Sequence, residues 1–273
     1  MNLDLLDFAT QYGVRLCKEA IPNSELRTLY EGMVCGQTLP NSDHKRVLLD
    51  TGLIHVLVVS GAHLHFLERW LRVLPQSLRT ALLFLYCWLC GFNPPVTRAW
   101  IARMVRHRLE NSGQRFSPLQ TEAFVSVLVL LLIPSWFSSL SFHMSWMCAL
   151  ALSVPKIFPR YPHFSTCLSC YAFLFFFIPM APTTIVANLV LVPIIGIGLL
   201  PLCLIAIFIP PLIPLMNSIW NILFAVLAVW PQASPADWRL PMGALAALTI
   251  ATHLLLLIGE VHWRRRLAFS SSY

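Results

Sequence analysis

Long apolar segments dominate the second half of this sequence. They run at about residues 119–134, 141–154, 164–181, 183–213, 217–231 and 241–260. A helix needs about 20 apolar residues to cross the hydrocarbon core of a bilayer, so several of these segments have a suitable length. In lipid, only helices and closed barrels satisfy every backbone polar group. The pattern predicts an all-α, polytopic helical membrane protein with about seven to nine membrane segments.

The composition agrees with a membrane protein. Of 273 residues, 57% are hydrophobic and 11% are charged, whereas an ordinary soluble domain is about 25% charged. The eight cysteines are scattered, and the nearest pair, Cys167 and Cys170, has no second pair at zinc-binding spacing. We interpret the cysteines as small buried hydrophobic residues. The acidic start, Met1–Asp7, is unlike a cleavable signal peptide, so none is expected.

Charge is distributed unevenly along the chain. Residues 1–50 carry a net charge of −2, and the remainder carries +9. The commoner cause of a basic membrane domain is a set of positively charged cytoplasmic loops, for which the best candidates are residues 103–115, 156–160 and 264–266. The alternative is a path for a polyanion, because phosphates favour grooves that are lined by Lys and Arg.

The chain divides into three parts by composition. Residues 1–50 predict an amphipathic helical lead-in that is able to lie on the membrane surface. Residues 51–263 form the membrane domain, and residues 264–273 form a basic C-terminal tail. The run at 183–213 is too long for one crossing and contains several prolines and glycines. We expect two short or broken helices there, or one crossing with a re-entrant piece.

One polar interruption is Ser60-Gly61, which His55, His63 and His65 flank. Gly tolerates unusual backbone angles and Ser can cap a helix, so a helix break is predicted at this point. On a continuous helix the three histidines would not share one face, and no His-Glu-x-x-His pattern is present, so a metal site is not favoured. Two roles stay open: the Ser and His side chains cap the carbonyls freed by the break, or they line a pore.

The second interruption is Asn93-Pro94-Pro95, which ends one apolar run, and Arg98 opens the next. Arg98 is either an arginine that snorkels to the membrane edge or a fixed positive charge near a channel mouth. Further basic residues follow at Arg103, Arg106 and Arg108. They slightly favour the second interpretation.

Two further residues need an interpretation. Asn188 is an isolated amide among apolar residues, so it requires interhelical partners; it either ties helices together or lines a path. Ser60 lies in Val-Ser-Gly-Ala rather than in a Gly-x-Ser-x-Gly motif. This context gives little support to an intramembrane hydrolase that would use Ser60 with His63.

At these positions the sequence resembles the ComEC-type competence proteins, which are inner-membrane channels for DNA uptake. Four motifs of their membrane domain occur in order, as Gly52-Leu-Ile-His55-Val-Leu-Val-Val-Ser60-Gly61-Ala62-His63, Gly91-Phe92-Asn-Pro94-Pro-Val-Thr-Arg98-Ala99, Leu140-Ser141-Phe142 after Pro134, and Asn188-Leu189-Val-Leu-Val-Pro193. The lead-in Leu29-Tyr-Glu-Gly-Met-Val-Cys-Gly36 is similar to a small-residue helix that precedes the first motif. The resemblance covers about residues 15–230.

The resemblance implies a multi-pass protein of the cytoplasmic (inner) membrane that conducts single-stranded DNA. Arg98 and Arg103 would compensate phosphate charge along the strand. The path or the broken helices around it would involve His55, Ser60, Gly61, His63 and Asn188. No cofactor, metal or enzymatic activity is implied for this chain. The expected partners are single-stranded DNA, the lipid bilayer, a DNA receptor outside and a helicase-like ATPase inside.

The sequence departs from the full-length family members. These carry an N-terminal β-domain and a C-terminal metallo-β-lactamase-like domain, and no His-x-His-x-Asp-His cluster occurs in this sequence. We therefore expect any nuclease to be encoded separately. The alternative functions are a small-anion permease, a non-catalytic structural membrane subunit and, with less support, the intramembrane hydrolase.

Overall fold

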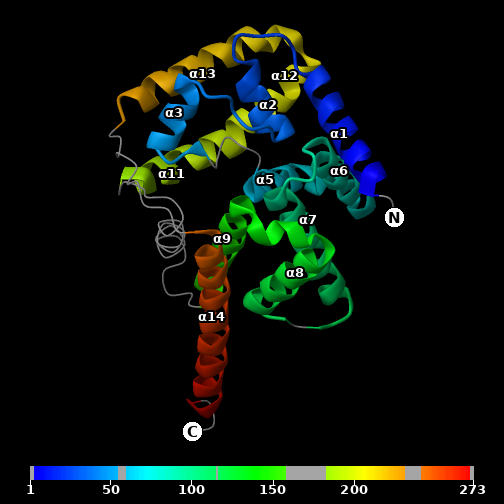
Figure 1. The fold of residues 1–273 in the computed structure, drawn as a ribbon, viewed down its shortest axis with the longest axis vertical. Coiled ribbons are helices and arrows are strands. Elements are labelled where there is room, and N and C mark those ends of the chain that lie inside the picture. Colours follow the sequence, from blue (N-terminus) through cyan, green and yellow to red (C-terminus); the bar gives the residue numbers. More distant parts are fainter. Residues whose placement is uncertain (1–2, 55–59, 115, 158–182, 231–240, 271–273) are drawn as a thin grey trace. The chain divides into compact units, whose positions relative to one another are not determined.

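The computed structural model describes residues 3–54, 60–114, 116–157, 183–230 and 241–270, and every regular element among them is a helix (Figure 1). Three helical stretches are long and apolar enough to cross a membrane: Val186–Phe208, Pro210–Ala228 and Met242–His262. Two shorter apolar helices cover Pro118–Leu132 and Leu140–Val154. The prediction of an all-α polytopic membrane protein is confirmed. The expected apolar segment at 164–181 lies outside the described residues.

The chain forms two compact units. The first contains residues 1–100 and 180–236, and the second contains residues 101–179 and 237–273. The helices of the first unit are α1 (Leu3–Ala20), α2 (Arg27–Cys35), α3 (Asp43–Asp50), α5 (Gly61–Trp70), η1 (Leu71–Val73), α6 (Gln76–Leu89), α11 (Thr183–Pro193), η3 (Ile194–Leu199), α12 (Leu200–Phe208), η4 (Pro210–Leu212) and α13 (Ile213–Ala228). Helix α7 (Pro94–Asn111) begins in the first unit and continues into the second. The second unit adds α8 (Pro118–Leu132), η2 (Pro134–Ser138), α9 (Leu140–Ile157) and α14 (Met242–Ser270).

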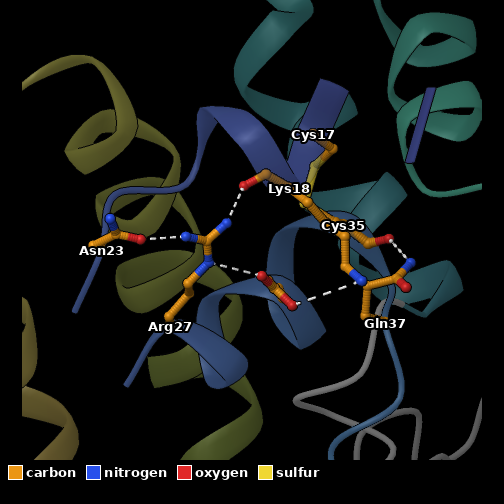
Figure 2. A network of polar contacts seen from close by, with 7 residues as sticks. Cys17, Lys18, Asn23, Arg27, Cys35 and Gln37 are labelled. Atoms are coloured by element: carbon orange, nitrogen blue, oxygen red, sulfur yellow. Dashed lines mark hydrogen bonds and ion pairs between the residues drawn. A yellow bond between two sulfur atoms is a disulfide. The ribbon is translucent and has the colours of Figure 1, made fainter. Parts of the chain in front are cut away.

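The N-terminal helices α1 and α2 are joined covalently. The interpretation of all eight cysteines as small buried hydrophobic residues is wrong for Cys17 and Cys35, which form a disulfide (Figure 2). These two residues are 18 positions apart, and only the packing of α1 against α2 brings them together. Cys87, Cys90 and Cys203 are buried free thiols, as expected.

Polar contacts close the connection between α1 and α2 (Figure 2). The Arg27 guanidinium donates to the Glu31 carboxylate at 2.9 Å and to the Lys18 carbonyl at 2.9 Å. It also donates to the side chain of Asn23. One arginine therefore contacts the end of α1, the connecting segment and the start of α2.

The core of the first unit packs this hairpin against two of the candidate spans. Helix α2 contacts α12, and α3 contacts α13. Met33, Leu48 and Trp220 are fully buried in one hydrophobic cluster. The Tyr30 hydroxyl donates to Asn217 Oδ1 at 3.1 Å, which adds a polar contact between α2 and α13.

The apolar run at 183–213 is helical from Thr183 to Phe208, with a six-residue π-helical segment, η3, in the middle. The expected two short or broken helices correspond to α11 and α12, but η3 joins them without an interruption into one stretch that is long enough to cross a membrane. A π-helical turn changes the hydrogen-bond spacing, and this change lets a helix continue where proline cannot supply an N–H. The break comes instead at Ile209, where the backbone leaves the helical region and the η4 turn leads into α13.

The second unit is built on α8, α9 and α14, which contact one another (Figure 1). Ser117 caps α8 in a capping box with Gln120. The Leu140-Ser141-Phe142 motif begins α9, and Phe142 is fully buried with its ring edge-on to Trp146. This motif therefore supplies the centre of the second hydrophobic core.

Candidate functional site

The helix break predicted at Ser60-Gly61 is confirmed. Ser60 has an extended backbone, with φ −128° and ψ 170°, and helix α5 begins at Gly61. The Ser60 backbone N–H donates to His63 Nδ1 at 2.9 Å, and Ser60 Oγ lies 3.2 Å from the same nitrogen. The His63 side chain therefore caps a freed N–H group at the start of α5, whereas we had expected a capped carbonyl.

The geometry defines the protonation of His63. The ring is 2% exposed and lies outside the candidate spans. Burial lowers the pKa of His63 to about 4, so the imidazole is neutral at physiological pH. Because Nδ1 accepts the Ser60 N–H, its lone pair is already in use and the ring proton lies on Nε2. This arrangement favours a capping role over a Ser60–His63 nucleophile pair.

Gly61 brings α5 into close contact with α7. A Cβ at Gly61 would lie 3.3 Å from the Ala99 Cβ and 3.4 Å from the Pro95 carbonyl oxygen. A larger side chain would push the two helices apart. Arg98 belongs to this turn of α7, and only 6% of it is exposed. Such burial does not fit an arginine that snorkels to water at a membrane edge.

Helix α5 also docks on the π-helical segment. A Cβ at Gly196 would fall within the ring of Phe66, which belongs to α5. The Phe66 ring thus occupies the space that a side chain at Gly196 would fill. Through Gly61 and Phe66, one short helix connects the first motif with both α7 and the 183–208 stretch.

The loop before α7 is fixed by the lead-in helix. Asn93 Nδ2 donates to the Gly36 carbonyl at 2.8 Å, and Cys90 Sγ lies 3.3 Å from the Val34 carbonyl. Phe92 has a positive φ of 47°, a backbone conformation that non-glycine residues seldom adopt. The end of α2 and this strained turn together set the start of α7, which carries Arg98.

The remaining predicted residues lie apart from this cluster or outside the described residues. Arg103 is on α7, five positions after Arg98, and is 8% exposed. Asn188 Nδ2 donates to the Thr184 carbonyl at 2.8 Å, within α11. This bond lies inside its own helix, and the interhelical partner expected for Asn188 stays a prediction. His55 lies outside the described residues.

A group of polar contacts in the second unit was not predicted from the sequence. Ser117 Oγ donates to Glu260 Oε2 at 2.7 Å, which joins α8 to α14. Trp146 Nε1 donates to His253 Nδ1 at 3.0 Å, and His253 Nε2 donates to the Leu119 carbonyl at 3.0 Å. The sequence did contain a signal for these contacts, because single ionisable residues within apolar segments mark polar contacts or functional sites.

Glu122 on α8 belongs to the same unit. Its carboxylate lies 3.8 Å from an Arg106 guanidinium nitrogen, and Glu122 is 6% exposed. Among the described residues, no group of three His, Cys, Asp or Glu side chains is placed to hold a metal ion.

The fold and site define a helical membrane protein with a capped helix break next to a buried arginine. The sequence model of the family described as Competence protein matches residues 36–266. The chain therefore belongs to the competence protein family. Over 147 residues it is 33% identical to an uncharacterized protein of Aquifex aeolicus (strain VF5), and the alignment covers 49% of this chain.

That alignment covers 34% of the Aquifex protein, so the chain spans about a third of this relative's length. No solved structure matches the chain. The three apolar helices, together with the family, support a membrane location.

Proposed function

We propose that this chain is a component of an inner-membrane channel that passes single-stranded DNA during natural competence. The observation that carries the proposal is the burial of Arg98 on the turn of α7 that packs against the Ser60-Gly61 break. A buried guanidinium group is costly to remove from water, so its presence favours a functional role. Family membership supplies the substrate class.

The chemistry of the substrate supports this role. A single strand in transit needs positive charge along its phosphates and walls that accept any base. Arg98 offers a buried guanidinium group on α7. Arg103 is also buried, but it lies five positions later and about 140° around the same helix, so it would act at a different point of the path. The capped break at Ser60 and His63, and the close contact at Gly61, would hold the helices around the path.

The proposal includes partners. A DNA receptor would deliver the strand from outside, and a helicase-like ATPase would draw it inward. A separately encoded nuclease would degrade the other strand, and the present chain would act without enzymatic activity. Co-purification from competent cells with each partner's gene intact or deleted would test these associations.

The proposal is tested with three variants of α7 in a cell whose DNA uptake depends on this protein. Arg98→Gln removes the charge, Arg98→Lys keeps it, and Arg108→Gln is the control because Arg108 is exposed on the same helix. We expect all three proteins at wild-type membrane levels. Uptake of labelled DNA should fall at least tenfold in Arg98→Gln, recover partly in Arg98→Lys and stay unchanged in the control.

Two results would contradict the channel role of Arg98. One is normal DNA uptake by a normally abundant Arg98→Gln protein. The other is disappearance of the protein from the membrane, which would show that Arg98 is needed for folding. If the protein were a small-anion permease, Arg98→Gln would reduce the uptake of labelled phosphate or sulfate, and DNA uptake would persist.

A further inference from the structure

The α1–α2 hairpin lies beside the turn that joins two candidate membrane spans. Pro22, Ser24 and Tyr30 line a small pocket together with Ile207 and Ile213. The last two residues flank the η4 turn, at which the Val186–Phe208 span ends and the Pro210–Ala228 span begins. A turn between two membrane crossings lies at a surface of the bilayer. The hairpin is therefore at that surface.

The disulfide identifies which surface this is. Disulfides persist in oxidising compartments outside the cytoplasm and are rare within it. Cys17 and Cys35 are bonded to each other, so the hairpin that they close belongs on the extracytoplasmic side. The pairing alone gives this assignment, without any use of the charge pattern.

One face of α1 carries an exposed apolar row. Phe8, Tyr12 and Leu16 are 68%, 49% and 36% exposed and recur every four residues on the helix. Phe84 and Leu85 on α6, which packs beside α1, are also exposed. Large apolar and tyrosine side chains in such a row suit the boundary between lipid headgroups and acyl chains.

The other face of α1 is held by the protein. Trp88 Nε1 donates to the Ala9 carbonyl at 2.7 Å, and Gly13 lies directly against Trp88. Cys17 is buried on this side and bonded to α2. The disulfide and the tryptophan fix the rotation of α1, so the apolar row cannot turn inward.

We propose that the disulfide-linked α1–α2 hairpin lies on the extracytoplasmic surface of the membrane, with the Phe8, Tyr12 and Leu16 row in the headgroup boundary. The bilayer is the partner because the row belongs to the unit that contains two candidate spans, and the hairpin that carries the row lies beside the turn that joins them. The η4 turn opens to the same side. This orientation holds whether or not the protein conducts DNA.

The first test measures the orientation of the hairpin with an exposed residue of α1. Glu19→Cys is introduced into the full chain, with the Cys17–Cys35 pair intact and the other six cysteines replaced. An impermeant maleimide should label Glu19→Cys in intact spheroplasts and a cytoplasmic marker protein of the same cells only after permeabilisation. Labelling of Glu19→Cys only after permeabilisation would overturn the proposal.

The second test measures the disulfide in the cell. Proteins are trapped by acid and treated with a polyethylene-glycol maleimide, with and without prior reduction. In the background with six cysteines replaced, reduction should add two maleimide labels in wild-type cells. In cells without the extracytoplasmic thiol oxidase, two labels should appear before reduction. Two free thiols in wild-type cells would contradict the assignment.

The third test measures contact with lipid. Nitroxide labels at Leu16→Cys and Gln11→Cys lie about 140° apart around α1. In nanodiscs of phosphatidylethanolamine and phosphatidylglycerol, the Leu16 label should collide more with oxygen, and the Gln11 label more with a water-soluble nickel complex. A Leu16 label that is accessible to nickel would show that the row does not contact the bilayer and that a protein partner covers it instead.

Discussion

Two glycines give α5 its closest contacts in the first unit. Gly61 begins this helix and touches α7, and Gly196 receives the Phe66 ring on the π-helical segment. In both cases the missing Cβ is what allows the contact, whereas Gly198 has no atom within 4 Å of an added Cβ. Glycines two positions apart on one segment therefore have different roles.

This difference gives a residue-scale prediction. Gly196→Ala should lower stability by about 2 kcal/mol, because overpacking forces a rigid ring to move. Gly198→Ala should be neutral or slightly stabilising, since it adds no contact. Thermal unfolding in detergent checks both variants. The double variant Gly196→Ala with Phe66→Ala should recover part of the loss, and no recovery would contradict the assigned contact.

His63 gives a pH-dependent prediction. Its pKa falls from 6.5 to about 4 because burial opposes the charged ring. As the pH falls, His63 in the unfolded chain binds a proton before His63 in the folded chain does. The contribution of this group to folding stability is therefore complete above pH 6.5 and is lost as the pH falls toward 4. The loss from this group amounts to roughly 3 kcal/mol.

The matched variants separate capping from titration. His63→Gln keeps an acceptor at the usual capping-box position, whereas His63→Leu removes it. Unfolding midpoints between pH 4 and 8 should show a weaker pH dependence in both variants. Only His63→Leu should also lose about 1 kcal/mol at neutral pH. Equal stability of the two at pH 8 would show that the cap is unimportant.

At the scale of elements, Ser117 joins two helices of the second unit. Its hydroxyl accepts from the Gln120 N–H at the start of α8 and donates to the Glu260 carboxylate on α14. The group is thus both a helix cap and a bond between helices. Its removal should affect the docking of α14 as well as the start of α8.

We therefore expect Ser117→Ala to lower stability by about 2 kcal/mol, from the lost cap and a buried carboxylate that loses one donor. Ser112→Ala is the control, because Ser112 is exposed and its hydroxyl donates to the Leu109 carbonyl three residues earlier. The measurement is thermal unfolding of both variants in the same detergent. A Ser117→Ala protein as stable as the control would contradict the role of the α8–α14 contact.

At the scale of the whole molecule, large apolar side chains stay exposed on the helices that are long enough to cross a membrane. Leu254, Leu255 and Ile258 on α14 are each more than half exposed, and Ile222 on α13 is 65% exposed. Water would disfavour such surfaces strongly, whereas acyl chains accept them. The described spans therefore require a bilayer.

This predicts that the protein is integral to the membrane. Alkaline carbonate should leave it in the pellet, and only detergent should release it. A peripheral protein of the same cells serves as the control and should appear in the carbonate supernatant. Recovery of the full-length chain in that supernatant would be incompatible with the described spans.

Much of the local structure could be predicted. The break at Ser60-Gly61 and the end of a helix before Pro94 follow from backbone preferences of Gly, Ser and Pro, which act within a few residues. The role of His63 was less accessible, because either a carbonyl or an N–H could have been its partner. The continuous helix through Pro201 was not expected, since a π-helical segment has no distinct sequence signal.

The sequence by itself determined the fold class, because long apolar segments with few charges can satisfy their backbone only as helices in lipid. It also located the motif that places Arg98 after a helix break. Tertiary structure alone decided that Cys17 pairs with Cys35, that Phe66 fills the space at Gly196 and that Ser117 reaches Glu260. These contacts join residues far apart in the chain. Their partners are chosen by the packing of whole helices, which no local pattern encodes.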